Sequence, residues 1–421
     1  MSQVNEPSNR YKHMEIKLGE MIQLNWTTAQ GEHSLVSDKG IKMTAETADE
    51  NFASRLVYQP QESTLFNFTT LDNQHVIKNR EWAEVTVIRP YCEGVDENGK
   101  TYSVYMDLQT PNENRFPEQP YPALLFIHGG GWNSGSYAEL YRFIDVAKAH
   151  GYVAISIDYR LNQPNSAGSW PAQIQDAKCA VRWLRENADT YQIDSDRIGV
   201  VGHSAGAHLA LLLGLTHAAT NPQIAGEFDT FKDAGSFSGV DDGVQAVVSI
   251  GGVTNLAKAY AYLGSDIMQT AAKSGIKTLA GNRAPTTIDD PDYEILNPRH
   301  FINRENSQLP FLFIAGSKDS VAKTSQSCET KNALEHYRSA DDKVDVLEYP
   351  DATHFDFIAV RKTSDSVNPL DDFAASITSA ISGAYVDQTI YDVFQFLDFH
   401  LKGNQQAINY SVAPLEHCME D

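Results

Sequence analysis

The sequence lacks several features that would point to other classes of protein. It contains no run of about 18 or more apolar residues, so no segment is long enough to form a membrane-spanning helix. Its N-terminus, MSQVNEPSNRYKHMEIK, does not have the basic and then apolar pattern of a secretory signal. We therefore expect a soluble protein that is cytoplasmic, or secreted with its signal peptide already removed.

Basic residues are scarce. The 421-residue chain has 33 Lys and Arg against 55 Asp and Glu, which gives a formal net charge of −22. A surface with this balance repels phosphate backbones and anionic membranes. We therefore expect neither nucleic acid nor a membrane among its partners. The sequence does not indicate an oligomeric state.

Cysteines are few and widely spaced. The four are Cys92, Cys179, Cys328 and Cys418, and no two are close enough for a metal hook or a CxxC redox pair. We therefore predict no metal site. Cys179 falls in a helical pattern and is interpreted as a buried small apolar residue. The sequence leaves room for one disulfide without indicating its partners.

The chain changes character after about residue 80. Residues 1–80 are polar with no clear period and are predicted to form an N-terminal extension that packs on a main domain, residues 81–421. Buried strands are expected at residues 102–111, 122–130, 152–159, 197–204, 244–252, 310–319 and 343–350, and helices at 138–151, 171–191, 205–217, 328–340 and 385–402. This alternation predicts an α/β fold, a mainly parallel twisted sheet with helices on both faces.

In such sheets the ligand lies at the carboxyl ends of the strands. Two insertions follow secondary-structure elements, at residues 216–242 and 253–308. Loops of this length are usually functional covers or disordered segments. The second follows a strand end and is a candidate cover for the active site.

A pentapeptide, GHSAG at residues 202–206, joins one predicted strand to the next helix. It fits G-x-S-x-G, in which a sharp turn exposes a serine at a helix N-terminus, where the helix dipole favours negative charge. The alternative is a small-residue turn with a capping serine. The apolar strand before it and the apolar helix after it favour Ser204 as a nucleophile.

A second motif, HGGGW at residues 128–132, follows another buried strand. Consecutive glycines let bare backbone approach a substrate and present N–H groups to an oxyanion. The alternative is a flexible glycine turn. The position of the motif favours an oxyanion hole made by the amides of Gly130, Gly131 and Ala205. His128 is expected to brace this loop by hydrogen bonding.

An acid and a base are expected in chain order after the serine. Asp319 follows the strand FLFIAG, and His354 lies in the loop after VDVLEYP. His354 would accept the serine proton, and Asp319 would orient the imidazole. Rival residues are interpreted as turn, cover, packing or surface groups; they are Asp351, Asp290, Asp292, His203, His208, His336 and His400.

Aromatic residues near these loops are candidates for a substrate pocket. They are Trp132, Trp170 and Phe355, and His203 beside the nucleophile is a fourth candidate. Ordinary packing is the alternative for each. The DYR motif, Asp158 to Arg160, ends a strand and is interpreted as an Asp–Arg structural brace rather than a catalytic carboxylate.

These motifs, in this order and spacing from Thr101 to Lys402, resemble the α/β-hydrolase superfamily. Within it they resemble bacterial carboxylesterases related to hormone-sensitive lipase and to acetylxylan and feruloyl esterases. The resemblance implies serine ester hydrolysis without a cofactor, with Ser204 as nucleophile. It also implies Asp319 as the acid, His354 as the base, and an oxyanion loop at Gly130 and Gly131. Two features depart from it: Ala207 stands where many relatives have glycine, and residues 358–384 are a long segment.

The leading hypothesis is therefore a serine carboxylesterase for short acyl or aryl esters of the acetyl and feruloyl kind, acting through an acyl-enzyme. A peptidase or amidase, a lipase, and a non-catalytic binding protein on the same fold are the alternatives. The small N-terminal extension argues against a peptidase with a propeller domain, and the polar character of residues 253–308 argues against a lipase. The sequence does not specify the acyl or alcohol group.

Overall fold

The computed structural model describes residues 90–95, 101–162, 168–217, 239–358, 384–404 and 406–416, the single residues 99, 237 and 418, and the backbone of the strands before residue 90. The predicted insertion at 216–242 and the segment at 358–384 therefore lie largely outside the described residues. The chain divides into two compact units, with residues 1–90 in one and residues 91–360 and 376–421 in the other.

The first unit is built from strands, which the sequence analysis did not predict for residues 1–80. An antiparallel sheet has the order β1 (Met14–Ile16), β6 (Thr64–Thr69), β3 (Gly31–Ser37), β4 (Lys42–Thr47). In addition, β2 (Met21–Trp26) pairs with β5 (Ser54–Tyr58) and with the first part of β7 (Glu84–Val95). The expected packing of this extension on the main domain stays a prediction.

The second unit contains a mixed, mainly parallel sheet, which confirms the predicted fold class. Its strand order is β14 (Asp345–Tyr349), β13 (Phe311–Gly316), β12 (Ala246–Ile250), β11 (Ile193–His203), β9 (Tyr121–Ile127), β10 (Val153–Ile157), β8 (Thr101–Gln109) and then β7. The six strands from β14 to β10 are mutually parallel, and β8 is antiparallel to β10.

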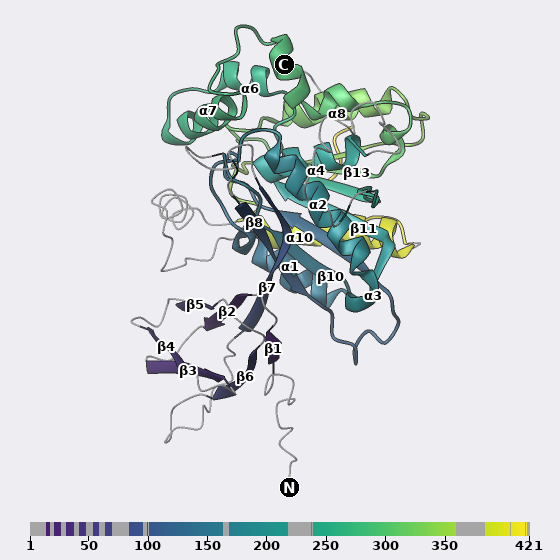
Figure 1. Ribbon diagram of the computed structural model, residues 1–421. Helices are drawn as coiled ribbons and strands as arrows, with labels where there is room; N and C mark the ends of the chain where they lie inside the picture. Colours follow the sequence, from purple (N-terminus) through teal and green to yellow (C-terminus); the bar gives the residue numbers. More distant parts are fainter. Residues whose placement is uncertain are drawn as a thin grey trace. The chain divides into compact units, whose positions relative to one another are not determined.

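Helices cover both faces of this sheet because its central strands are apolar on both sides. Along β9, Leu124 and Phe126 pack in one cluster with α1 (Tyr141–Ala149) and α10 (Val386–Lys402). The alternating Leu125 and Ile127 pack in the other cluster with α2 (Ala172–Glu186) and α4 (Ala205–Leu215) (Figure 1). The predicted helix at 171–191 is interrupted, and α3 (Ala188–Tyr191) forms its last turn.

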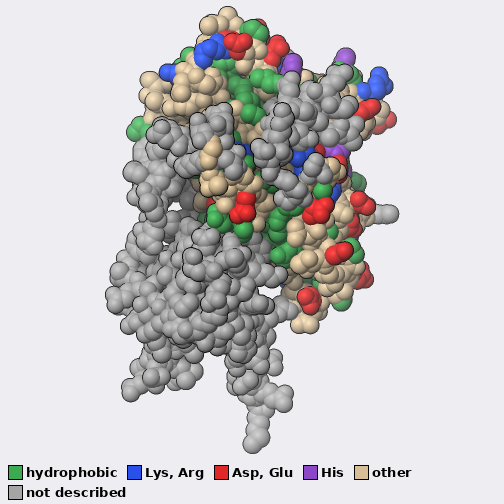
Figure 2. Space-filling view, in the orientation of Figure 1, with side chains coloured by type: hydrophobic (Ala, Val, Ile, Leu, Met, Phe, Trp, Pro, Cys, Tyr) green, Lys and Arg blue, Asp and Glu red, His purple; other side chains and the backbone are tan. Residues whose placement is uncertain are grey.

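The predicted cover, residues 253–308, contains five short helical elements. They are α6 (Leu256–Tyr262), α7 (Ile267–Leu279), η3 (Pro291–Leu296), η4 (Pro298–Phe301) and η5 (Asn306–Gln308). Figure 1 shows α6 and α7 together at one end of the unit. On the face seen in Figure 2, Asp and Glu side chains are scattered over the described residues. Among the described helices, none is long and apolar enough to cross a membrane.

Both pairs of cysteines form disulfides, which corrects the interpretation of Cys179 as an unbonded buried residue. Cys179 on α2 is bonded to Cys92 on β7, and Cys328 on α8 (Thr324–Glu335) is bonded to Cys418. The bonded cysteines are 87 residues apart in the chain in the first disulfide and 90 residues apart in the second. Because the spacing is so long, no local motif in the sequence could have indicated either pairing.

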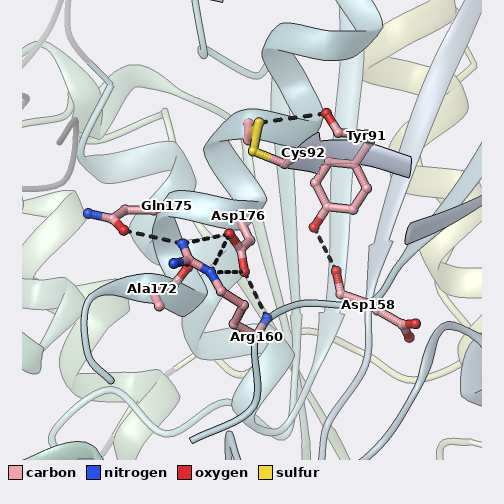
Figure 3. The surroundings of a disulfide bond; sticks show 8 residues. Tyr91, Cys92, Asp158, Arg160, Ala172, Gln175 and Asp176 are labelled. Atoms are coloured by element: carbon pink, nitrogen blue, oxygen red, sulfur yellow. Dashed lines mark hydrogen bonds and ion pairs between the residues drawn. A yellow bond between two sulfur atoms is a disulfide. The ribbon is translucent and has the colours of Figure 1, made fainter. Parts of the chain in front are cut away.

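The surroundings of the first disulfide correct a second prediction (Figure 3). The Arg160 guanidinium pairs with the buried Asp176 of α2, with Nη2 and Oδ1 2.8 Å apart. The Asp158 side chain instead accepts a hydrogen bond from the backbone N–H of Tyr137 at 2.8 Å. The arginine of the DYR motif is thus a structural brace, but its carboxylate partner comes from a helix rather than from the same motif.

Candidate active site

The serine of GHSAG occupies a sharp turn between β11 and α4. Ser204 has φ 54° and ψ −118°, a region that non-glycine residues rarely adopt. The flanking glycines are required by space: a Cβ on Gly202 would lie 2.2 Å from the Gly206 carbonyl oxygen, and a Cβ on Gly206 would lie 2.1 Å from that of Ile127. The Ser204 N–H donates to the Ile250 carbonyl at 2.9 Å, which fixes the turn against β12.

The three predicted residues of the triad lie within hydrogen-bonding distance of one another. Ser204 Oγ is 2.8 Å from His354 Nε2, and His354 Nδ1 is 2.7 Å from Asp319 Oδ2. They are brought together because β11, β13 and β14 are parallel, so their carboxyl ends meet at one edge of the sheet. Asp319 and His354 are each 5% exposed, whereas Ser204 is only partly buried.

The hydrogen bonds of Asp319 define the state of the histidine. Its Oδ1 accepts from the backbone N–H groups of Val321 and Ala322, both at 2.8 Å. Its Oδ2 faces His354 Nδ1, and because a carboxylate only accepts, that nitrogen carries the proton. His354 Nε2 is therefore the acceptor for the Ser204 hydroxyl, as a general base requires.

The glycine loop, residues His128–Trp132, has an unusual backbone. Gly130, Gly131 and Trp132 have φ values of 97°, 58° and 61°. The Gly130 carbonyl accepts from the Asn133 and Ser134 N–H groups at 3.2 and 3.1 Å. A Cβ on Gly130 would lie 2.2 Å from the Ser134 carbonyl oxygen, so only glycine fits.

The glycine loop lies directly against Ser204. A Cβ on Gly129 would lie 3.2 Å from the Ser204 Cβ. Within the described part of the chain, the backbone N–H groups of Gly130, Gly131 and Ala205 donate to no protein acceptor. The Ala205 amide also begins α4, where helical N–H groups have no partner within the helix.

The candidate pocket residues have different surroundings. Trp132 and His203 are buried, at 2% and 1% exposure, whereas Trp170 and Phe355 are partly buried. The Phe355 ring centroid lies 5.0 Å from that of His354. Trp170 lines a cavity of about 330 Å³ that the cover also bounds. The other residues around that cavity include Asn162, Ser169, Thr278, Arg283 and Leu296.

Three buried histidines support the site. The Nε2–H of His203 donates to the His354 carbonyl at 2.9 Å, and His128 Nδ1 contacts the Gly129 carbonyl at 2.8 Å. His208 contacts Trp132 and the Leu296 carbonyl. Burial lowers the pKa of His128 and of His208 to about 4, and burial together with the nearby His354 lowers that of His203 to about 3. All three are therefore neutral at pH 7.

The rival acidic residues lie in other surroundings. Asp351 is exposed and pairs with the exposed Lys318 at 2.6 Å. Asp290 pairs with Arg283 in the cover at 2.9 Å, and these hydrogen bonds lower the pKa of Asp290. Asp292 is also in the cover and pairs with the same arginine at 3.1 Å. None of these carboxylates contacts His354 in the described structure.

The rival histidines His336 and His400 are also placed away from the triad. His336 is an exposed residue at the end of α8, and His400 packs against Phe396 and Phe399 on α10.

One contact between the glycine loop and the cover was not predicted from the sequence. Gly275 of α7 lies so close to Gly131 that an added Cβ would be 2.6 Å from the Gly131 carbonyl oxygen. A glycine inside a helical pattern was the only available signal, because glycine in a helix interior often marks a close approach.

A strained serine after a buried strand, with an acid and a base at the ends of the following parallel strands, defines the α/β-hydrolase class. The BD-FAE family model matches residues 106–334, which is more than half of the chain. That range includes Ser204 and Asp319 and ends before His354. The chain therefore belongs to the BD-FAE family of α/β-hydrolase esterases.

Known proteins show the same relationship. The chain is 33% identical to esterase LipC of Mycobacterium tuberculosis over 60% of its own length and 58% of LipC. It is 28% identical to esterase LipQ of the same organism, over 77% of this chain and 69% of LipQ. It thus spans a little over half to two thirds of the length of these relatives. A solved bifunctional GH43-CE protein from Bacteroides eggerthii shares the fold, with a TM-score of 0.50, 17% identity, and coverage of 80% of this chain and 50% of that one.

Proposed function

We propose that the protein is a serine carboxylesterase whose catalytic residues are Ser204, His354 and Asp319. The observation that carries this proposal is the continuous hydrogen-bonded series from Ser204 Oγ through His354 to Asp319, at the N-terminus of α4. This geometry provides a nucleophile, a base that can accept its proton, and an acid that orients the base. Membership of an esterase family supports the same reaction.

The reaction proceeds in two halves. Ser204 Oγ attacks the ester carbonyl while its proton passes to His354 Nε2, and the alcohol leaves with that proton as the acyl-enzyme forms. Water then attacks the acyl-enzyme, giving its proton to His354, and the acid leaves as Ser204 regains a proton. In both halves the negative oxygen of the tetrahedral intermediate is expected to accept from the amides of Gly130, Gly131 and Ala205. Removing one such donor typically costs about 10²–10³-fold in rate.

The proposed substrates are short acyl or aryl esters of the acetyl and feruloyl kind. The family is named for bifunctional feruloyl and acetyl xylan esterases, which supports both acyl groups. A lipase is less well supported because only two large apolar side chains of the described cover are exposed, Ile267 at 65% and Ile288 at 50%. No step of this mechanism uses a cofactor or metal ion.

The two disulfides bear on where the protein folds. All four cysteines are paired, and disulfides form and persist mainly in oxidising compartments. We therefore favour the secreted alternative over the cytoplasmic one. Recovery of the fully disulfide-bonded chain only from an oxidising compartment of the producing cell would support this inference.

The test of the proposed function is hydrolysis of p-nitrophenyl acetate, p-nitrophenyl octanoate, methyl ferulate and the matched p-nitroanilide by the wild type and Ser204→Ala. We expect the acetyl and feruloyl esters to be hydrolysed fastest and Ser204→Ala to lose at least about 10³-fold. Faster anilide turnover would favour an amidase, and a steep preference for octanoate would favour a lipase. Wild-type activity in Ser204→Ala would refute the mechanism.

A further inference from the structure

His208 lies one helical turn beyond the proposed nucleophile and is completely buried. Its backbone N–H donates to the Ser204 carbonyl at 3.1 Å, which ties the two residues to the same turn of α4. The backbone of His208 is therefore held at a fixed place relative to that of Ser204. The proposed mechanism does not use the His208 imidazole.

The imidazole makes two hydrogen bonds that together define one tautomer. Its Nδ1 lies 3.2 Å from the indole Nε1 of Trp132, and its Nε2 lies 2.6 Å from the Leu296 carbonyl oxygen. The indole N–H only donates and the carbonyl only accepts. His208 must therefore accept at Nδ1 and donate at Nε2, which only the neutral Nε2–H form can do.

The partner on the Nδ1 side belongs to the glycine loop. Trp132 is 2% exposed, and it ends the run of three residues with positive φ that begins at Gly130. A bulky residue with φ 61° is strained, so contacts elsewhere must hold it in place. Two such contacts are visible: the Asn162 N–H donates to the Trp132 carbonyl at 2.8 Å, and the indole donates to His208.

The partner on the Nε2 side belongs to the cover. Leu296 is the last residue of η3 and is buried. Trp170, which lines the adjacent cavity, has its ring centroid 6.1 Å from that of His208. His208 thus joins the helix that carries the nucleophile to both the glycine loop and the cover.

We propose that His208 is a positioning residue, which holds Trp132 so that the amides of Gly130 and Gly131 face the oxyanion. The inference rests on the proposed function, because it assumes that these amides act on the transition state. An apolar side chain of similar size would fill the same space but would leave the buried indole N–H and the Leu296 carbonyl without partners. The imidazole is suited to this place because it satisfies both groups from a single ring.

Three substitutions separate the two hydrogen bonds. In His208→Asn the amide oxygen takes the position of Nδ1 and can accept from Trp132. In His208→Gln the amide nitrogen reaches the position of Nε2 and can donate to Leu296. His208→Phe fills the site and supports neither bond. His300→Phe is the matched control, since His300 lies in the same cover segment with a side chain that is 44% exposed.

We expect kcat for p-nitrophenyl acetate to fall about 10-fold or more in His208→Phe and His208→Gln, because displaced oxyanion donors lose part of their effect. His208→Asn should stay within about threefold of the wild type, since it keeps the bond to Trp132. KM should change little in all three, and inactivation by a phosphonate should slow in parallel with kcat. The indole N–H resonance of Trp132, assigned with Trp132→Phe, should shift in His208→Phe and not in His208→Asn.

The proposal is overturned if His208→Phe unfolds at a lower temperature but keeps the wild-type kcat, because that result describes a packing residue. It is also overturned if His208→Gln is as active as, or more active than, His208→Asn. That comparison decides the question even where His208→Phe does not fold. Either failure leaves the dependence of wild-type activity on Ser204 intact, whereas failure of the proposed function is seen directly in Ser204→Ala.

Discussion

Replacing Asp319 with asparagine should reverse the proton arrangement of the triad without changing its shape. Two backbone N–H groups, those of Val321 and Ala322, already donate to Asp319 Oδ1 at 2.8 Å. An asparagine that turned its NH₂ toward them would leave both without an acceptor, at about 1–3 kcal/mol each. The asparagine oxygen therefore stays on that side, and its NH₂ points to His354.

In Asp319→Asn, His354 meets a hydrogen-bond donor where the wild type has a carboxylate acceptor. Its Nδ1 must accept from the asparagine NH₂, so the ring proton moves to Nε2, which can no longer accept from Ser204. The same change in a serine protease triad lowers kcat by about 10⁴-fold. That loss corresponds to about 5.4 kcal/mol of transition-state stabilisation, at 1.36 kcal/mol for each factor of ten.

The assay measures kcat and KM for p-nitrophenyl acetate at pH 7.5 in the wild type, Asp319→Asn and Asp351→Asn. Asp351 is the matched control because it lies in the loop of His354 but pairs only at the surface, with Lys318. Exposed ion pairs contribute about 0–1 kcal/mol to stability, so Asp351→Asn should fold as the wild type does. Its activity should then be close to that of the wild type, because Asp351 does not contact His354. The proposed role of Asp319 is refuted if Asp319→Asn keeps a tenth or more of the wild-type kcat, or if Asp351→Asn loses as much kcat as Asp319→Asn.

Three further predictions follow from other parts of the structure. Gly275→Ala should lower kcat about 10-fold, because the added Cβ would push on the Gly131 carbonyl. Alanine is better than glycine in a helix by about 1 kcal/mol, so the loss of kcat should not come from a weaker helix. An unchanged kcat would contradict the close contact between Gly275 and Gly131. Cys418→Ser should lower the free energy of unfolding by about 4.5 kcal/mol, because its disulfide closes a loop of 90 residues, and urea titration measures this. The buried His128, His203 and His208 are neutral in the folded protein and take up protons when it unfolds. The free energy of unfolding should therefore fall as the pH falls from 6.5 toward 4, by up to about 4 kcal/mol per pH unit for the three together. Equal melting temperatures at pH 6.5 and pH 5 would contradict those lowered pKa values.

The fold of the second unit could be predicted because each buried strand is a short apolar run that ends at a glycine or a polar residue. The runs before His128 and Ser204 correspond to β9 and β11, and the motif order placed the site residues at one edge of the sheet. The same patterns did not reveal the strands of residues 1–80, where polar residues show no clear period.

Contacts between distant segments were beyond the reach of local patterns. The partner of Arg160 is Asp176, which lies on a helix rather than in the DYR motif. The two disulfides join residues about 90 positions apart. The sequence predicts only a packing role for His208, because it lies beside the serine motif. Its two partners, an indole N–H and a carbonyl, come from segments that sequence spacing does not relate to it.

In the proposed mechanism, Ser204 carries the acyl group during turnover. The most direct measurement is peptide mass spectrometry of the folded protein after reaction with a fluorophosphonate, in the wild type and in Ser204→Ala and His354→Ala. We expect one adduct, on the peptide that contains Ser204, with no labelling of Ser204→Ala and much slower labelling of His354→Ala. An adduct on another residue, or continued ester hydrolysis by fully labelled protein, would contradict it.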